Sequence, residues 1–381
     1  MSQTCFTTHC PFSSSRHKIF VATNKKCGLV RNRPLFLVLE ATRIDPEPKN
    51  GYSRVSLGSI SVSALGVGTW AWGNKLLWGY DESMDEQLEK VFACTLDAGV
   101  NLFDSGDSYG TGRLNGRSEL LLGKFTQNYK RSKPDTTIHI ATKFAAYPWR
   151  LSRGSLVSAC KGSLRRLQME QLSLGQLHWS TNNYIPFDLQ DRQLWDGLGD
   201  LLDQGLISAA GVSNYGPSQL RRVCEHLIGR GQKLSSLQIQ FSLLSQDWEG
   251  IFEVCDYYGV KVIAYSPLAL GLLTGKYSDS NLPSGLRGSF FKRVIPQLRE
   301  LHGVLSDIAS QRNRTMAQVC INWCMAKGTI PIPGAKNLEQ LQENLCALGW
   351  TLTSAEVRAL DEAARRVPKE GRMVQNVFQS S

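Results

Sequence analysis

Four side chains that can move protons or stabilise charge stand at or just beyond the ends of short β-rich runs. Asp104, Lys143 and His178 each end such a run, and Tyr109 follows Asp104 by five residues. A carboxylate, an ammonium, an imidazole and a phenol can together hold a proton, transfer it and polarise a bound group. Singly, each has an ordinary explanation as a helix cap, a surface cation or a core histidine. Their recurrence at successive run ends favours one shared catalytic site.

The elements that would carry these residues alternate between β-rich runs and amphipathic stretches from about Gly51 onward. The runs predict eight strands, at Ala64–Thr69, Asn101–Asp104, Thr137–Lys143, Leu172–His178, Ile207–Ser213, Leu237–Phe241, Val260–Tyr265 and Thr329–Ile332. Apolar residues near a 3.6 spacing predict helices between them, including Asp85–Ala98, Ser152–Leu167, Leu189–Gln204, Ser218–Gly231 and Met316–Lys327. Eight such units predict an α/β fold, a (β/α)8 or TIM barrel, in which catalytic residues lie at the C-terminal ends of the strands.

Two segments outside this alternation of strands and helices are predicted to form a hairpin and a lid. Val55–Val62 contains two alternating runs around a Gly-Ser turn, which predicts a β-hairpin that plugs the N-terminal end of the barrel. Leu268–Pro296, after the seventh strand, is a long irregular segment that we interpret as a lid. We therefore divide the chain into a presequence at residues 1–45, a barrel at residues 51–370 and a C-terminal tail at residues 371–381.

The charge distribution argues against nucleic-acid binding. The net charge is +10, but residues 1–50 carry eight basic and three acidic side chains, so half of the excess lies in the first eighth of the chain. In the remainder, charges of both signs are interleaved and no basic run carries aromatic residues. With 42% hydrophobic residues, the chain can bury a core of its own.

The first 45 residues have the composition of an organelle transit peptide. They are rich in Ser, Thr and Arg, and no acidic residue precedes Glu40. The longest apolar stretch, Leu35–Leu39, is too short to span a bilayer. The hydroxyl-rich start favours a plastid over a mitochondrion, so we expect a chloroplast protein, in the stroma or attached peripherally to plastid lipid bodies such as plastoglobules. The alternative is a disordered tail with no targeting role.

The cysteines predict neither a disulfide framework nor a metal site. Three of the ten lie in the presequence, and the other seven form no Cys-x-x-Cys pair and no Cys/His set at zinc spacing. Cys320 and Cys324 are four residues apart and would share one face of a helix. We interpret that pair as core packing rather than as a redox switch.

The segments around the four proton-handling residues resemble motifs of the aldo-keto reductase family. The motifs occur in the family's order: Gly68–Trp70, Phe103–Gly110, Arg117–Gly123, Ala141–Phe144, Gln176–Trp179, Gly211–Tyr215 and Ile332–Gly334. The resemblance runs from about Ser56 to Ala364. It is greatest for the branch with a Gly-Ala-Lys-Asn type of C-terminal motif, which includes plastid pyridoxal reductase, potassium-channel β subunits and many bacterial reductases. The resemblance implies NADPH-dependent reduction of an aldehyde or ketone to an alcohol.

That reaction gives each of the four residues a role. Reduction of a carbonyl adds hydride at carbon and a proton at oxygen, and Tyr109 would donate the proton. Lys143 would lower the pKa of this phenol from its usual value of about 10, while Asp104 would hold Lys143 charged and oriented. His178 would hydrogen-bond the substrate oxygen as negative charge develops there.

The hydride must come from a bound nicotinamide, because no side chain supplies one. No Gly-x-Gly-x-x-Gly follows a strand, so a Rossmann site is excluded. The resemblance instead places NADPH or NADP+ across the barrel mouth, with the Tyr265 ring stacked under the nicotinamide. The cofactor-binding residues that it implies are Thr69, Trp70, Ser213, Asn214, Gln238, Tyr265, Ser266, Pro267, Leu268, Lys276, Gly334, Lys336, Gln340, Glu343 and Asn344.

Lys336 favours NADPH over NADH, because a 2′-phosphate attracts a cation. Three positions depart from the family pattern. Gln340 stands where Arg is frequent, which weakens the argument for strict NADP specificity. Ser180 replaces a common Pro and Gly106 replaces Ala or Ser, and both changes are expected to alter loop shape rather than chemistry.

Other functions remain open at this stage. One is an NADP(H)-sensing binding subunit with little turnover, like the channel β subunits, and another is a structural or lipid-droplet-associated plastid protein. His178 favours an enzyme, because a protein relieved of catalysis could lose the imidazole without losing its fold. The substrate would be a small carbonyl compound, with pyridoxal and lipid-derived carbonyls as candidates. The two tryptophans of Trp72–Trp78 either line its pocket or pack in the core. The sequence indicates no particular oligomeric state.

Overall fold

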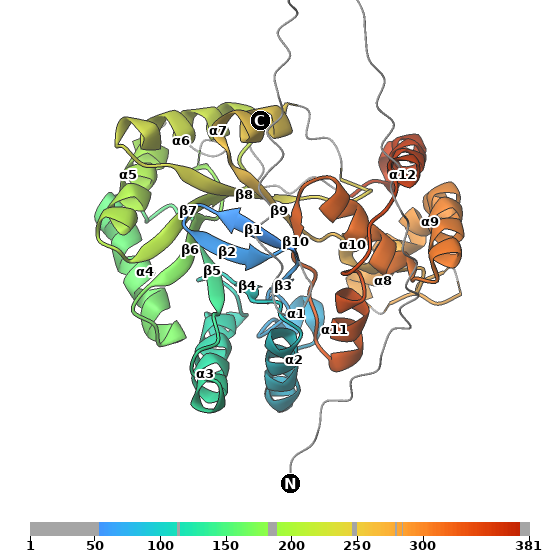
Figure 1. Ribbon diagram of the computed structural model, residues 1–381, viewed down its shortest axis with the longest axis horizontal. Coiled ribbons are helices and arrows are strands. Elements are labelled where there is room, and N and C mark those ends of the chain that lie inside the picture. Colours follow the sequence, from blue (N-terminus) through green and yellow to red (C-terminus); the bar gives the residue numbers. More distant parts are fainter. Residues whose placement is uncertain are drawn as a thin grey trace, which may run out of the picture. The chain divides into compact units, whose positions relative to one another are not determined.

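Eight parallel strands in chain order form the centre of the molecule (Figure 1). The structure, a computed structural model, describes residues 53–112, 115–181, 189–245, 250–278, 280–283 and 285–373. The strands are β3 (Gly66–Gly68), β4 (Leu102–Asp104), β5 (His139–Phe144), β6 (Leu172–Leu177), β7 (Ile207–Ser213), β8 (Leu234–Gln240), β9 (Lys261–Tyr265) and β10 (Ile330–Pro331). Each falls within or overlaps one of the eight predicted strands, so the predicted TIM barrel is confirmed.

The barrel closes where the first strand meets the chain after the last. A parallel bridge joins Gly68 to Gly334, and the Gly68 amide donates to the Pro333 carbonyl at 3.2 Å. A Cβ atom on Gly68 would lie 2.8 Å from the Ile332 carbonyl oxygen. A side chain at position 68 would therefore push the two edges apart, and glycine is required for closure.

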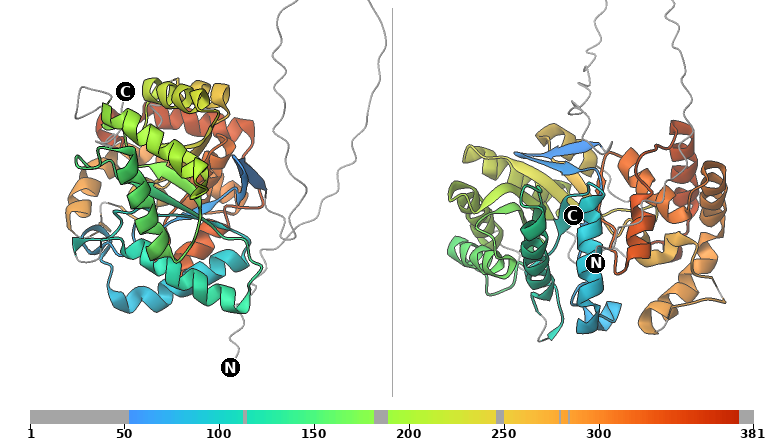
Figure 2. Two further views of the ribbon diagram at one scale, coloured as in Figure 1. Left: turned by 90° about the vertical axis from the view of Figure 1, so that its left-hand side faces the viewer. Right: turned by 60° about the horizontal axis from the view of Figure 1, so that its bottom comes forward.

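Helices follow the strands and pack around the sheet (Figures 1 and 2). They are α1 (Lys75–Trp78), α2 (Asp85–Asp97), α3 (Arg117–Ser132), α4 (Arg153–Leu167), α5 (Leu189–Asp203), α6 (Pro217–Gly229), α7 (Ile251–Tyr258), α8 (Gly285–Val294), α9 (Arg299–Arg312), α10 (Met316–Ala326), α11 (Leu338–Leu345) and α12 (Ser354–Arg366). Short 3₁₀ turns lie at Glu82–Met84, Ala269–Thr274, Ile295–Leu298 and Lys369–Gly371. Capping boxes begin three of the helices, with Ser152, Thr315 and Thr353 as the N-cap residues.

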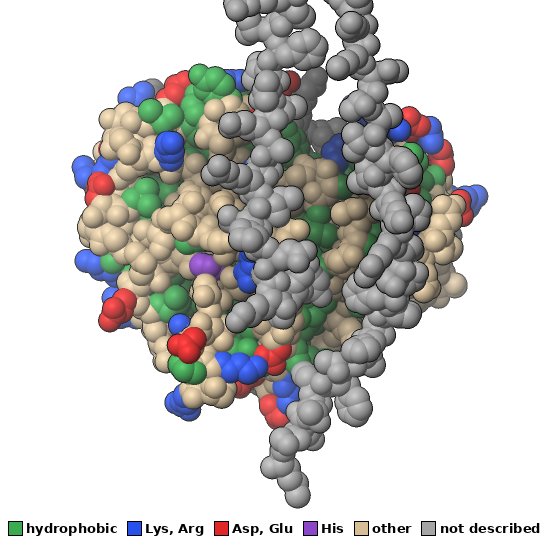
Figure 3. All heavy atoms as spheres, viewed as in Figure 1, with side chains coloured by type: hydrophobic (Ala, Val, Ile, Leu, Met, Phe, Trp, Pro, Cys, Tyr) green, Lys and Arg blue, Asp and Glu red, His purple; other side chains and the backbone are tan. Residues whose placement is uncertain are grey.

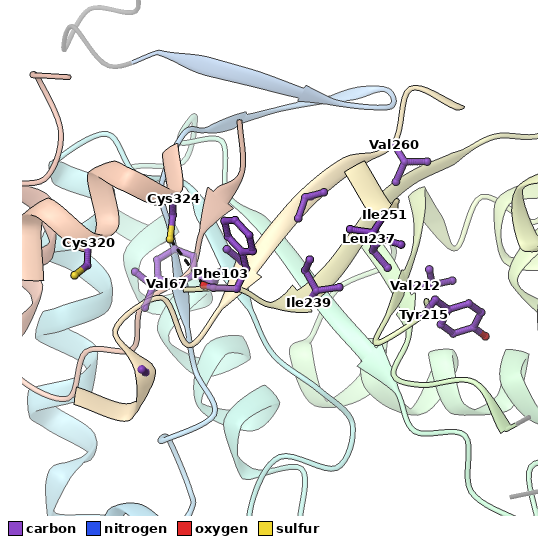
Figure 4. Packing of buried hydrophobic residues seen from close by; sticks show 14 of the residues in the cluster. Val67, Phe103, Val212, Tyr215, Leu237, Ile239, Ile251, Val260, Cys320 and Cys324 are labelled. Carbon is purple, nitrogen blue, oxygen red and sulfur yellow. Dashed lines mark hydrogen bonds between the residues drawn. The ribbon is translucent and has the colours of Figure 1, made fainter. Parts of the chain in front are cut away.

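The core lies between the strands and the helices (Figure 4). Phe92 of α2 packs on Phe103 of β4 with ring centres 4.5 Å apart, and Phe241 stacks on Trp323 of α10 at 5.0 Å. Cys320 and Cys324 are both buried in this cluster, so their interpretation as core residues is confirmed. Burial raises the pKa of both thiols, which leaves them protonated and unreactive.

The predicted hairpin is formed by β1 (Arg54–Leu57) and β2 (Ile60–Ser63). Leu57, Ile60 and Val62 pack on apolar side chains that point into the barrel from six strands and the chain after β10: Leu102, Ala141, Leu174, Ala209, Ile263, Ile330 and Ile332. At the turn, the Ser59 hydroxyl donates to the Ser208 carbonyl at 2.9 Å. The hairpin therefore closes the N-terminal end of the barrel, as predicted.

The segment after β9 differs from the prediction of an irregular Leu268–Pro296. It contains the 3₁₀ turn Ala269–Thr274, helix α8 and the start of the 3₁₀ turn Ile295–Leu298. Phe291, Val294 and Leu298 are fully buried in the core, and this anchoring holds α8 in place. The glycines of α8 interrupt the apolar spacing, so the sequence pattern conceals the helix.

The two ends of the chain bear on the predicted domain boundaries. Residues 1–45 and the apolar stretch Leu35–Leu39 lie outside the described residues. At the other end, Gly371 is buried and the Met373 amide donates to the Leu244 carbonyl at 3.1 Å, so the first residues of the predicted tail pack on the barrel.

No helix in the described part of the chain is long and apolar enough to cross a membrane. On the visible face in Figure 3, basic and acidic side chains are interspersed.

The hairpin plug generates a stability prediction. Gly58 has φ +59°, and a Cβ atom there would lie 2.4 Å from the Ser235 hydroxyl oxygen of β8. We expect Gly58→Ala to lower the free energy of unfolding by about 1–3 kcal/mol, through backbone strain and the clash. Gly259→Ala is the control, since Gly259 has φ +69° with no atom within 4 Å of the added Cβ. Urea unfolding should show a larger loss for Gly58→Ala, and equal losses would contradict the tight seating of the hairpin.

Candidate active site

The four predicted catalytic residues converge at the C-terminal ends of neighbouring strands. Asp104 ends β4, Lys143 is the penultimate residue of β5, and His178 directly follows β6. Lys143 Nζ lies 2.5 Å from Asp104 Oδ2 and 4.9 Å from the centre of the Tyr109 ring. The Tyr109 and His178 rings meet edge to face with their centres 5.9 Å apart. A phenol and an imidazole thus contact each other beside a buried cation.

The ion pair of Lys143 and Asp104 is fully buried, with 1% and 3% of each residue exposed. Two glutamine amides donate to the other carboxylate oxygen, Asp104 Oδ1: Gln238 at 2.7 Å and Gln176 at 3.2 Å. Both carboxylate oxygens are therefore hydrogen-bonded without water, which a buried charge requires. Gln238 was predicted to bind the cofactor, and in this structure its amide N–H is committed to Asp104. Gln176 was not predicted to belong to the site. Its position could have indicated this, because residues two apart in a strand lie on the same face and His178 follows Gln176 by two.

The pKa of Tyr109 departs from its ordinary value in the direction opposite to the prediction. Burial and the negative charge of Asp104 raise it well above 10. The Lys143 charge, which was predicted to lower this pKa, is paired with Asp104 at 2.5 Å. Burial also lowers the pKa of Lys143. The phenol is therefore fully protonated at neutral pH.

His178 is neutral at physiological pH. Burial lowers its pKa well below the usual 6.5, and the nearby charge of Lys143 lowers it further. Its Nδ1 atom is buried and has no hydrogen-bond partner among the described residues. A buried polar atom without a partner is costly to the folded state.

A second polar network joins the C-terminal ends of β6, β7 and β9. The Asn214 amide nitrogen, just after β7, donates to the His178 carbonyl at 3.0 Å and to the Ser213 hydroxyl at 3.2 Å. The Tyr265 hydroxyl at the end of β9 donates to Asn214 Oδ1 at 2.8 Å. Three predicted nicotinamide-binding residues are thereby brought together beside the catalytic group. Asn214 adopts φ +61°, a conformation that Asn tolerates better than most residues.

The loop after β9 carries three further predicted cofactor residues, Ser266, Pro267 and Leu268. Ser266 has φ +52°, and its carbonyl accepts the Ala269 amide at 2.9 Å. Ala269 and Leu270 also have positive φ values, of 47° and 58°. Strained backbone of this kind concentrates where a loop must approach a ligand closely.

Three cations gather around two aromatic rings on the same rim. Lys336 Nζ and Arg287 Cζ lie 5.7 and 5.5 Å from the centre of the Trp78 ring. Arg287 also lies over Tyr277 at 5.3 Å, and Lys276 Nζ lies 5.9 Å from the same ring. Among the described residues, none of the three cations forms an ion pair with a carboxylate. We call Lys276, Arg287 and Lys336 the cation cluster.

The cation cluster has the character of a site for a phosphorylated ligand. Burial lowers the pKa of Lys336, and the positive charges of Arg287 and Lys276 lower it further. Mutual repulsion of this kind is relieved when an anion binds. Trp78 Nε1 and Arg287 Nε are buried donors without partners among the described residues. Lys276 and Lys336 were predicted to bind the cofactor. Arg287 was not predicted, because it lies on α8, a helix within the segment that the sequence pattern predicted to be irregular.

The segment before α11 is held by its own side chains. The Lys336 amide donates to Gln340 Oε1 at 2.9 Å, and the Gln340 amide donates to the N-cap Asn337 at 2.9 Å. The Asn344 amide nitrogen donates to the Gly334 carbonyl at 3.3 Å. Gln340, where the family often has Arg, thus positions the backbone of Lys336. Glu343, also predicted, is half-buried on the same helix.

The predicted residues of the loop after β3 separate into two groups. Thr69 is fully buried, and its hydroxyl donates to the Asp104 carbonyl at 2.9 Å. Trp72 is also buried and donates to the Ala335 carbonyl at 2.9 Å, so it packs in the core. Trp70, in contrast, is 39% exposed and meets Trp78 edge to face at 5.8 Å. Trp70 and Trp78 therefore line the rim beside the cation cluster.

Comparison with known proteins agrees with this geometry. A sequence model of the Aldo/keto reductase family matches residues 64–365.

The chain belongs to the aldo/keto reductase family. It is 53% identical over 332 residues to "Pyridoxal reductase, chloroplastic" of Arabidopsis thaliana, which covers 86% of this chain and 90% of the relative. It is 28% identical over 326 residues to "Probable aldo-keto reductase 1" of Glycine max, with 81% and 88% covered.

Solved structures of the family have the same fold. A thermostable aldo-keto reductase crystallised with the inhibitor epalrestat superposes with a TM-score of 0.62 and 27% identity, covering 81% of this chain and 99% of that one. A Bombyx mori aldo-keto reductase in complex with NADP superposes with a TM-score of 0.64 and 19% identity, covering 84% and 94%. The described residues hold no group of three or more His, Cys, Asp or Glu side chains placed to bind a metal ion.

The structure accounts for the two loop departures from the aldo/keto reductase pattern. A Cβ atom at Gly106 would lie 3.0 Å from the Tyr109 ring, so glycine lets this ring lie closer to the backbone than Ala would. The Ser180 hydroxyl bonds to the buried Asp191 carboxylate, which also accepts the Thr181 amide at 2.7 Å. Ser180 thereby ties the loop after β6 to α5, a contact that Pro could not make.

The buried ion pair generates a second stability prediction. We expect Lys143→Met to lower the free energy of unfolding by about 3–5 kcal/mol, because Asp104 is left charged and uncompensated. Adding Asp104→Asn should recover most of that loss, since the remaining pair is neutral. Chemical unfolding of both single variants and the double variant measures the coupling. Additive losses would show that the two side chains do not act as a pair.

Proposed function

We propose that this aldo/keto reductase reduces a small aldehyde or ketone to an alcohol with NADPH, and that Tyr109 donates the proton. The observation that carries the proposal is the contact between Tyr109 and His178, with the Lys143–Asp104 pair beside the phenol. The protonated phenol and the neutral imidazole beside it both suit a carbonyl oxygen that gains negative charge.

Each residue has a task that follows from its surroundings. His178, neutral and partly buried, orients the substrate oxygen by a hydrogen bond. Tyr109 keeps its proton until the oxygen becomes an alkoxide, which is a far stronger base than a phenolate. Lys143 stabilises the phenolate that remains, and Asp104 with its two glutamine donors keeps the ammonium in place.

The rim fits NADPH in two places. The cation cluster, with no carboxylate partner among the described residues, would hold the phosphates of the cofactor, and Lys336 would contact the 2′-phosphate. Asn214 and Tyr265 would hold the nicotinamide end beside the catalytic group. When bound, this cofactor supplies the hydride for the carbonyl carbon.

The substrate and location are proposed from the relatives. The Arabidopsis relative is named a chloroplastic pyridoxal reductase, so pyridoxal is the first substrate to test. Its name and the presequence composition together support delivery to the chloroplast, with residues 1–45 as a transit peptide and residues 51–370 as the enzyme. Within the plastid, we propose the stroma or a peripheral attachment to lipid bodies.

Tyr109→Phe tests the proton donor. The variant keeps the ring but cannot donate, so turnover of pyridoxal or 4-nitrobenzaldehyde should fall roughly 10²- to 10⁴-fold. Binding of NADPH, followed by protein fluorescence, should be unchanged. Unchanged turnover would remove Tyr109 from the mechanism. Tight NADPH binding by the unmodified chain with no turnover of any carbonyl would favour the cofactor-sensing subunit instead.

Lys336→Ala tests the preference for NADPH. Loss of a charge-assisted bond to the 2′-phosphate should weaken NADPH roughly tenfold to a hundredfold and leave NADH nearly unchanged. Lys90→Ala is the control, because Lys90 lies on α2 and pairs with Glu86 on the same helix. Dissociation constants for both cofactors measure the effect. A loss of the same size for NADH would assign Lys336 to the shared part of the cofactor.

A further inference from the structure

A continuous series of ring contacts leads from the catalytic phenol to the solvent. The Tyr109 ring meets His178 at 5.9 Å, His178 meets Trp179 at 4.8 Å, and Trp179 meets Tyr147 at 6.3 Å. Tyr147 then stacks on Trp149, with ring centres 4.6 Å apart and planes only 10° apart. All five side chains come from the loops after β4, β5 and β6, and we call this series the aromatic wall.

Trp149 is unusual among the members of this wall. It is 73% exposed, whereas Tyr147, Trp179 and His178 are partly buried. Tyr147 covers one face of the indole, which leaves most of the remaining surface open. Most of the Trp149 indole adds nothing to the core, so the face turned away from Tyr147 is open to a bound ring.

The loop that presents Trp149 is fixed by polar contacts that do not involve the indole. Arg150 donates to the Ala145 carbonyl at 2.6 Å and pairs with the buried Asp107 at 2.9 Å. The Gln190 amide nitrogen of α5 donates to the Tyr147 and Arg150 carbonyls at 2.8 and 3.1 Å. The stack of Tyr147 and Trp149 is therefore held in position before any substrate binds, and the loop does not need Trp149 for its shape.

We propose that Tyr147 and Trp149 form a stacking platform that selects substrates whose carbonyl is attached to a flat conjugated ring. The platform rests on the proposed carbonyl reduction and deepens it by naming the substrate class. Flat π-faces attract other flat rings beyond simple burial, and a puckered aliphatic ring of the same size gains little from them. Trp149 is thus a specificity-determining residue rather than a catalytic one.

Two aldehydes of matched size test the platform, benzaldehyde and cyclohexanecarboxaldehyde. In the full chain, Trp149→Leu keeps an apolar side chain and removes the π-face. It should raise KM for benzaldehyde roughly three- to tenfold and leave KM for cyclohexanecarboxaldehyde and both kcat values unchanged. Trp149→Phe should restore most of the affinity. Tyr257→Ala removes an equally exposed aromatic from α7, at 78% exposure, and should change neither KM.

Equal changes in KM for the two aldehydes, or none, would overturn the platform while leaving carbonyl reduction intact. If the unmodified chain reduces neither aldehyde, the proposed function fails, and binding then decides the platform. Calorimetry of the NADP+-loaded chain with benzyl alcohol and cyclohexylmethanol gives that readout. Weaker binding of benzyl alcohol alone in Trp149→Leu would support the platform, and unchanged binding would overturn it.

Discussion

The buried ion pair between Lys143 and Asp104 is the constraint on which the rest of the site depends. A charged pair can be kept out of water only when every lone pair and proton finds a partner. Here the partners come from different strands, because Gln176 and Gln238 reach the same carboxylate from β6 and β8. The strand register fixes this meeting, since Lys143 lies opposite Gln176 and Ser213 lies opposite Gln238. A slip by one residue would turn these side chains out of the barrel.

The two ends of the barrel differ in character: one is closed by apolar packing, and the other carries the polar candidate site. At the N-terminal end, the β1–β2 hairpin covers a layer of apolar strand residues. At the C-terminal end, the polar network opens onto a rim with two different sides. The loops after β9 and β10 carry cations, whereas those after β5 and β6 carry aromatic rings. A phosphorylated cofactor and a flat substrate would thus approach the same phenol from opposite sides.

Much of this arrangement could be predicted from the sequence, because parallel strands and their polar ends leave a local signal. The eight strands and the hairpin were predicted from patterns of a few residues each, and the four residues at strand ends do meet. The sign of the pKa shift of Tyr109 could not be predicted, because it depends on burial and on how closely Asp104 already pairs with Lys143. Arg287 was missed for another reason. It lies on α8, a helix with little amphipathic pattern that tertiary contacts through Phe291 hold in place.

The pKa directions also bear on which way the proposed reaction runs. Reduction needs a proton on the phenol when the alkoxide forms, and burial with the nearby Asp104 charge holds that proton on Tyr109 at neutral pH. Oxidation of an alcohol needs the phenolate as a base, and the same two effects make the phenolate scarce. In the proposed mechanism, oxidation should therefore require more alkaline conditions than reduction.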